Sequence, residues 1–434
     1  MTKKFKKFLI GFGTPIAATT ALIAASCGTK TQTPKKEVLD IPNPSNYINP
    51  NERVATITKD NTFTLPDSMV GTKIYVITDT GHVTDKSFNQ SQWEAALTIL
   101  DQTRKDEKNQ LEVKSVEPRE GKYDDSYRAA LTSGAKIWVL SGFTHIDHIK
   151  NFIQQNNAAL KQKGVKIFNV DFALNPTELN YPDIYNINFN VNEASWMAGY
   201  ALAKYVAENE TDKKLSSFGG GAFHGVTDYI TGYLKGILEW NKENPSKKVT
   251  HEAVRLDSGF QPGPQMDPVI TSALASNPVL IYPVAGPATK ATLDKLNQNN
   301  QSTYIVGVDV DQGKSLSAPD RFLTSVLKNM AQAVYDSILE KAFGDTKKPV
   351  FGDKNSVKGD FAEGWVGLAP SSLKNTTKRE KMNEAITAAE TKFNSLTADQ
   401  KTFIDSNKAT TDGTAYTDDQ LANLINALVE EVNK

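Results

Sequence analysis

Residues 74–93 read IYVITDTGHVTDKSFNQSQW, and this stretch decides the fold. The apolar run at its start has the composition and length of a buried β-strand. Gly81 then marks a turn, and Asp85 or Ser87 can cap a helix that begins near Phe88. A strand that leads through a short turn into a helix is typical of a βαβ unit, and it therefore predicts a parallel sheet.

The same alternation of strand and helix continues along the chain. Further apolar runs occur at 136–140, 165–170, 184–189, 215–218, 279–282 and 304–308. Segments with a helical period lie at 88–101, 146–156, 193–209, 226–243, 289–299 and 330–343. Roughly twelve elements of each kind would overfill a single sheet. We therefore predict an α/β protein with two lobes, each built on a parallel sheet.

Polar residues or glycines follow several of the predicted strands, among them Asp79, Asp171, Gly286 and Asp309. Ligands of open α/β sheets bind outside the carboxyl ends of the strands, so we expect these residues to face a cleft between the lobes. A carboxylate at Asp79 and an aromatic face at Phe88 suit a flat ligand that carries N–H donors. An ordinary turn with Phe88 packed in the core fits the spacing equally well.

The chain begins with a segment typical of an export signal. Four lysines within the first seven residues precede an apolar run at 8–25, which ends in small residues before Cys27, the only cysteine. This arrangement resembles a bacterial lipobox, in which 1–26 is removed and the acylated thiol holds the protein on the membrane. A buried free thiol is the less favoured alternative. Residues 27–70 are expected to form the lipid anchor and a tether, with a short edge strand at 54–65.

Charge and hydropathy narrow the possible functions. The formal net charge is −1; without residues 1–26 it falls to about −5, which argues against nucleic acid as a partner. After the export signal no stretch is apolar enough to span a bilayer. Residues 376–434 are polar, with a helical period at 375–396 and 418–432, and they predict a C-terminal helical extension. Its deletion is expected to leave ligand binding intact.

Two motifs that invite an enzymatic function are interpreted as structural. Gly219-Gly-Gly-Ala-Phe-His224 lacks the Gly-Lys-Ser/Thr of a phosphate loop, and no Gly-x-Ser-x-Gly nucleophile elbow occurs; a tight strand-to-helix turn is favoured. His145 and His148 have the i, i+3 spacing of a metal site on a helix, but a solvated helix start is favoured. An enzyme is therefore the least favoured function, and neither a metal nor a cofactor is expected.

Motifs distributed over residues 71–370 resemble the basic membrane protein family of lipoproteins, which includes bacterial purine nucleoside receptors. The strongest consists of Asp79, Gly81 and the pattern Asp-x-Ser-Phe-Asn at 85–89. The resemblance continues in order through Asp171, NEASWMAGY at 192–200, Gly219-Gly-Gly, IYPVAG at 281–286, VGVDVDQ at 306–312 and TSVLKN at 324–329. Mycoplasmas carry surface lipoproteins of this kind, and the tether, rich in Lys, Asn and Thr, resembles that type.

The resemblance implies a type 1 periplasmic-binding-protein clamshell, in which two doubly wound lobes are joined by three crossovers. Lobe 1 would contain 71–187 and 328–346, and lobe 2 would contain 188–327 and 347–375. The crossovers would lie near 186–190, 324–329 and 343–351.

The resemblance also implies binding roles for seven residues. Phe88 and Tyr282 would sandwich a base, although the family usually has Phe at the second position. Asp79 and Asp171 would accept hydrogen bonds from the base. Asp309 and Lys328 would hold the ribose hydroxyls, and Gly286 would let the backbone approach the ligand.

The function implied is capture of a nucleoside, purine in the first instance, and its delivery to an ABC permease at the extracellular face of the membrane by a monomeric lipoprotein. Two alternatives remain open at this stage. The same cleft can bind a sugar or another small polar solute, and the C-terminal extension is compatible with an adhesin or host-interaction lipoprotein.

Overall fold

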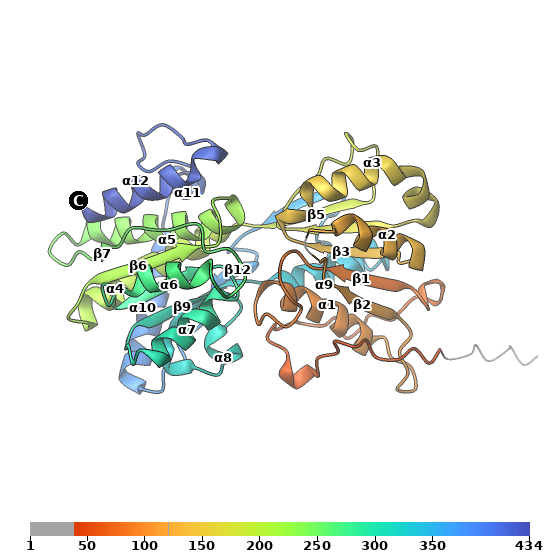
Figure 1. Cartoon of the computed structure of the whole chain (residues 1–434), viewed down its shortest axis with the longest axis horizontal. Helices are drawn as coiled ribbons and strands as arrows, with labels where there is room; N and C mark the ends of the chain where they lie inside the picture. Colours follow the sequence, from red (N-terminus) through yellow and green to blue (C-terminus); the bar gives the residue numbers. More distant parts are fainter. Residues whose placement is uncertain (1–38, 120) are drawn as a thin grey trace, which may run out of the picture. The chain divides into compact units, whose positions relative to one another are not determined.

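The computed structural model describes residues 39–119 and 121–434, so the predicted export signal and Cys27 lie outside the described residues. The described chain contains two six-stranded sheets, each at the centre of its own lobe (Figure 1). All strand pairs are parallel except one, which joins β10 to β12. The predicted α/β fold with two lobes is therefore confirmed.

Lobe 1 has the strand order β11-β5-β4-β3-β1-β2. Its strands are β1 (Lys73–Ile77), β2 (Glu112–Val116), β3 (Ile137–Ser141), β4 (Lys166–Val170), β5 (Ile184–Phe189) and β11 (Ser356–Gly359). Its helices are α1 (Phe88–Gln102), α2 (Tyr123–Ser133), α3 (Ile146–Lys163) and α9 (Met330–Lys341), with short 3-10 turns at Pro50–Glu52, Asp67–Met69 and Phe143–His145.

Lobe 2 has the strand order β12-β10-β9-β8-β6-β7. Its strands are β6 (Lys214–Gly219), β7 (Thr250–His251), β8 (Leu280–Val284), β9 (Tyr304–Asp309), β10 (Phe322–Lys328) and β12 (Val366–Leu368). Its helices are α4 (Val191–Asn209), α5 (His224–Glu243), α6 (Met266–Leu274), α7 (Ala288–Gln298), α8 (Gln312–Ser315), α10 (Thr376–Asn394), α11 (Ala398–Asp405) and α12 (Leu421–Asn433), with 3-10 turns at Pro319–Arg321 and Asp418–Gln420.

Strand β1 shows why these sheets are covered on both faces. Successive side chains of a strand point to opposite sides. Ile74 and Val76 enter one hydrophobic cluster, whereas Tyr75 and Ile77 enter another. Residues 74–77 are apolar on both sides of the strand, which is typical of a parallel sheet whose two faces are covered by helices.

Two predicted crossovers agree with the structure, and the third does not. The chain passes between lobes at Asn190, between β5 and α4, and at Asn329, between β10 and α9. The third passage lies at 360–365, after β11, rather than at 343–351. The boundary was wrong because 356–359 pairs with β5 and so extends the sheet of lobe 1. The three passages run close together, since the backbone N–H of Asn190 donates to Gly359 and that of Asn329 to Trp365.

Most of the predicted tether that the structure describes is packed on lobe 1. The indole of Trp93 donates to the Asn46 carbonyl at 2.8 Å, and the buried Glu94 carboxylate accepts the N–H groups of Val54 and Ala55. These backbone groups bond to a side chain of α1 rather than to a strand, so the edge strand predicted at 54–65 was wrong.

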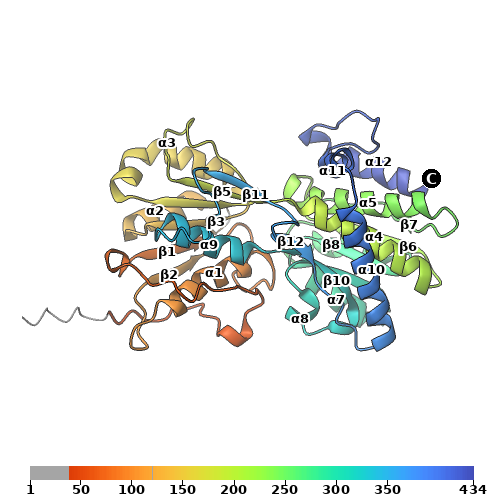
Figure 2. The same ribbon diagram turned by 180° about the vertical axis from the view of Figure 1, so that it is seen from behind.

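The C-terminal extension is helical, as predicted, but it is part of lobe 2. Figure 2 shows α10 packed across α4 and α12 lying beside α5. Met382 and Phe393 of α10 are buried, and so is Leu428 of α12. The buried ammonium of Lys235 on α5 donates to three backbone carbonyls at the end of α11, those of Phe403, Ile404 and Ser406.

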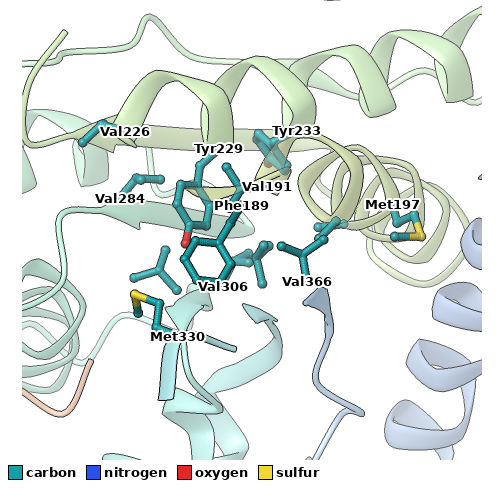
Figure 3. Packing of buried hydrophobic residues seen from close by; sticks show 14 of the residues in the cluster. Phe189, Val191, Met197, Val226, Tyr229, Tyr233, Val284, Val306, Met330 and Val366 are labelled. Carbon is teal, nitrogen blue, oxygen red and sulfur yellow. The ribbon is translucent and has the colours of Figure 1, made fainter. Parts of the chain in front are cut away.

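Apolar side chains from the lobe 2 helices and sheet meet near the passages between lobes (Figure 3). Phe189 at the end of β5 and Met330 at the start of α9 pack in the same cluster as Tyr229 of α5. Among the described residues no helix combines the length and hydropathy needed to cross a bilayer.

Candidate ligand-binding site

A pocket lies between the lobes, at the carboxyl ends of the strands of both sheets. It contains about 660 Å³ of space not filled by atoms, counted with its opening to solvent. Six of the seven residues predicted to bind ligand line it: Asp79, Phe88, Asp171, Gly286, Asp309 and Lys328. The structure therefore brings together residues from six separate places in the sequence.

Asp171 and Lys328 form an ion pair across the cleft. Asp171 follows β4 in lobe 1, and Lys328 ends β10 in lobe 2; the Lys328 ammonium donates to Asp171 Oδ2. The Lys328 side chain is only 2% exposed, and its ammonium lies 5.5 Å from the centre of the Phe88 ring. Burial raises the pKa of Asp171, and the adjacent ammonium opposes that rise. A buried cation beside an aromatic face is well placed to orient a polar ligand.

Asp309 accepts one hydrogen bond from each lobe. Ser87 Oγ of lobe 1 donates to Oδ2 at 2.6 Å, and the Tyr229 hydroxyl of lobe 2 donates to Oδ1 at 2.7 Å. Asp171 and Asp309 both have a positive φ, 70° and 67°. This backbone conformation is uncommon for residues other than Gly, and in both lobes it occurs at the carboxyl end of a strand: Asp171 follows β4, and Asp309 is the last residue of β9.

Asp79 and Asp85 occupy the turn between β1 and α1. Asp85 caps the helix, because its carboxylate accepts the backbone N–H groups of Ser87, Asn89 and Gln90. Asp79 Oδ1 accepts from Gly81 N–H at 3.2 Å and from the Asn89 amide at 3.3 Å. Burial raises the pKa of Asp79 to about 6, so this carboxyl changes charge close to neutral pH.

Three phenylalanines outside the predicted set also line the pocket: Phe143, Phe223 and Phe260. Phe143 of lobe 1 and Phe223 of lobe 2 are in ring contact, and Phe223 also packs against Phe260 at 5.9 Å between centroids. The glycines near Phe223 make room for its ring, since a Cβ on Gly221 would lie 2.8 Å from it. The predicted strand-to-helix turn at 219–224 is confirmed, and its glycines accommodate an aromatic side chain.

Tyr282 does not belong to the pocket, so its predicted stacking role was wrong. The residue is fully buried in the middle of β8, where its ring packs at 5.2 Å against that of Tyr233. Val284, two residues further along and on the same side of the strand, lines the pocket instead. The carboxyl end of the strand reaches the cleft, whereas its middle lies inside the lobe.

Several pocket residues carried only a weak sequence signal. Phe143 directly follows Gly142, and Phe223 comes two residues after the three glycines at 219–221. A position just after a strand and its glycines would have nominated both. Tyr229 lies inside a helix and Phe260 in a loop, with no local pattern that sets them apart. The sequence indicates Ser87 as a helix cap and as part of the motif at 85–89, but not as a partner of Asp309.

The histidine pair considered as a metal site has another role. His145 is buried rather than solvated, and its Nδ1 lies 2.6 Å from the Tyr127 hydroxyl. Its Nε2 contacts the carbonyls of Ile77 and Thr78, and burial lowers the pKa of His145 to about 3. Within 39–119 and 121–434 no three His, Cys, Asp or Glu side chains are grouped to hold a metal ion.

A family model described as Bmp, ABC transporter substrate-binding protein PnrA-like, matches residues 72–398. The chain belongs to this family. It is therefore an ABC transporter substrate-binding protein, and its two lobes with a pocket between them fit that role.

Curated relatives are distant but cover most of the chain. Basic membrane protein A of Borreliella burgdorferi is 25% identical over 264 residues, which is 60% of this chain and 70% of the relative. The ABC transporter nucleoside-binding protein BmpA of Lactococcus lactis is 24% identical over 326 residues, which is 71% of this chain and 86% of the relative.

Solved structures support the fold. A solute-binding protein of an ABC transporter from Aeropyrum pernix has a TM-score of 0.56 at 18% identity, over 77% of this chain and 89% of its own. A transcriptional activator of the comK gene from Bacillus halodurans has a TM-score of 0.51 at 16% identity, over 73% of this chain and 97% of its own. The fold is thus shared by a solute-binding protein and a transcriptional activator, two proteins with different functions.

Proposed function

We propose that this protein binds a nucleoside, with purine nucleosides as the first candidates, in the cleft between its lobes and delivers it to an ABC permease. The observation that carries the proposal is the pocket composition. Carboxylates from both lobes, a buried ammonium and several aromatic rings line one cavity. The name of the Lactococcus lactis relative, a nucleoside-binding protein, supports this choice of ligand.

Each part of a nucleoside has a chemically matched partner in the pocket. The ring of Phe88 offers a stacking surface, which contributes about 1–3 kcal/mol per base in other proteins. Asp79 and Asp171 are acceptors for base N–H groups, and Asp309 with Lys328 suits ribose hydroxyls. Gly286, with a φ of 49°, keeps the backbone at the cleft edge free of a side chain. Tyr282 has no part in this proposal.

The test is calorimetric titration of the purified protein, stripped of ligand by partial unfolding and refolding, with adenosine, guanosine, inosine, uridine, cytidine and thymidine. Saturable binding of at least one nucleoside is expected, with purines tighter than pyrimidines. Absence of heat with all six would refute the proposal. Mass spectrometry of small molecules that copurify with the protein separates a nucleoside from a sugar or another solute.

We further propose that the protein acts from the outer face of the membrane as a lipoprotein acylated at Cys27. The basis is the sequence before residue 39, which has the order of an export signal followed by a cysteine. Two acyl chains would hold the protein stably, whereas one alone binds marginally. Replacing Cys27 with Ser should abolish incorporation of labelled palmitate and release the protein into the medium. Unchanged labelling would refute the anchor.

A further inference from the structure

Ser87 stands at the cap position of α1, yet its side chain does not cap the helix. A serine there normally accepts an N–H group of the first turn. In this helix Asp85 accepts those N–H groups instead. The Ser87 hydroxyl is thereby left free to donate across the cleft to Asp309, at 2.6 Å. The local sequence thus supplies a second capping residue and directs the serine toward the other lobe.

Tyr229 approaches Asp309 from inside lobe 2. Figure 3 shows its ring extending from α5 with the hydroxyl oxygen directed away from the helix, and that oxygen donates to Asp309 Oδ1 at 2.7 Å. The ring is 2% exposed and packs among apolar residues of the lobe 2 core. Burial raises the pKa of Tyr229 well above its ordinary value, so the hydroxyl remains protonated and acts as a donor.

The two donors fix the plane of the Asp309 carboxylate and leave it with acceptor capacity. The terminal torsion of an aspartate is otherwise broad. An ionised carboxylate has about four acceptor positions, and the two protein hydroxyls use one on each oxygen. One position on each oxygen remains for a ligand. Two adjacent acceptors held in a fixed plane match the two adjacent hydroxyls of a cis-diol, such as the 2′- and 3′-hydroxyls of ribose.

We propose that Ser87 and Tyr229 are positioning residues that hold Asp309, one from each lobe, as an acceptor for a vicinal diol of the ligand. The Ser87 contact exists only when the lobes are together, so diol recognition is coupled to closure. The inference rests on the proposed function, because it assigns the selectivity of the nucleoside pocket for ribose over deoxyribose to these two hydroxyls.

The experiment compares the affinity of the purified protein for guanosine with its affinities for 2′-deoxyguanosine and 3′-deoxyguanosine, before and after Tyr229→Phe. If another nucleoside proves to be the ligand, its own deoxy analogues are used. Loss of the hydroxyl should lower the ribose-to-deoxyribose affinity ratio at least threefold, the equivalent of one hydrogen bond. Tyr233→Phe is the matched control. It lies one turn further along α5, equally buried, and its hydroxyl has no hydrogen-bond partner within the described chain.

Substitutions of Ser87 are the second part of the experiment. Ser87→Ala should lower the same ratio, and Ser87→Thr, which keeps a hydroxyl, should restore it. A ratio that stays unchanged or rises in both Tyr229→Phe and Ser87→Ala overturns the inference, even if ribonucleosides bind well. Failure of every nucleoside to bind the unaltered protein refutes the proposed function instead, so the two failures are distinguishable.

Discussion

The rings of Phe143 and Phe223, one from each lobe, lie with their centroids 3.6 Å apart. A flat base between two aromatic rings needs a separation of about 7 Å, twice the carbon–carbon contact distance. The pair therefore leaves no room for a base between its members. It is a hydrophobic contact that joins the lobes beside the pocket.

Breaking this contact should speed the escape of ligand. Aromatic pairs contribute about 0.5–1.5 kcal/mol beyond the area they bury, so Phe223→Ala should raise the dissociation rate constant of bound nucleoside about 3- to 10-fold. Stopped-flow displacement measures this rate. Phe260→Ala is the control, because Phe260 lines the same pocket but its ring contact, with Phe223, stays within lobe 2. Equal acceleration in both variants would contradict a role for the contact across the cleft.

Asp79 should make both stability and affinity depend on pH. Its pKa is raised to about 6 by burial, above the value of about 4 expected in the unfolded chain. Between these two pH values the folded protein keeps a proton that the unfolded chain has lost. Stability therefore falls as the pH rises through this window, by at most about 3 kcal/mol. A ligand N–H group requires the carboxylate form, so affinity should rise over the same range.

Asp79→Asn tests both halves of this prediction. At pH 7 the variant should unfold at a higher temperature than the unaltered protein, and the difference should shrink toward pH 4. Its affinity for nucleoside should be lower and independent of pH between 5 and 7. Differential scanning fluorimetry and calorimetric titration supply the two curves. A variant whose affinity keeps the original pH dependence would exclude Asp79 as the titrating group.

Removing the Asp171 carboxylate should weaken closure more than folding. Lys328 has no other ion-pair partner among the described residues, and breaking a buried pair costs about 3–5 kcal/mol when the remaining charge stays buried. Opening the cleft rehydrates Lys328, so the unfolding temperature of Asp171→Asn should change little while affinity falls. X-ray scattering with saturating nucleoside should show a larger radius of gyration.

The control for this variant is Asp183→Asn, because Asp183 pairs with Lys166 within lobe 1 and both side chains are about one third exposed. Exposed pairs contribute about 0–1 kcal/mol, so closure should be unaffected. If Asp171→Asn unfolds at a much lower temperature but still closes normally, the ion pair stabilises the fold rather than the closed cleft.

Deleting residues 376–434 should damage the protein, contrary to the expectation from sequence. The deletion would uncover the sides of α4 and α5 on which α10 and α12 are packed. Phe393, 2% exposed, contacts both Trp196 of α4 and Phe361 of a passage between lobes. Phe393→Ala alone should cost about 3–5 kcal/mol, measured by urea unfolding. The exposed Lys381→Ala should be neutral, and an equally neutral Phe393→Ala would contradict this packing role.

Much of the fold follows from local patterns. The seven apolar runs and six helical segments predicted along the chain all correspond to strands and helices of the structure. Five strands were not predicted. One of them, β10, was not predicted because its apolar run was interpreted as a crossover. The other four are short, polar or solvent-facing: β2, β7, β11 and β12. The third crossover was misplaced for the same reason, since the pairing of the polar segment 356–359 with β5 depends on residues about 170 positions away.

The sequence by itself determined that Asp79, Asp171 and Asp309 would lie at the edge of a sheet, because an apolar strand followed by a polar turn fixes that position locally. Only the tertiary structure decided which side chains share the pocket. The stacking role predicted for Tyr282 was wrong because the depth of this residue within β8 depends on how far the sheet extends toward the cleft. Tyr229 and Ser87 became partners of Asp309 because two lobes close on each other. Contacts between distant segments arise from packing, and no single stretch of sequence contains them.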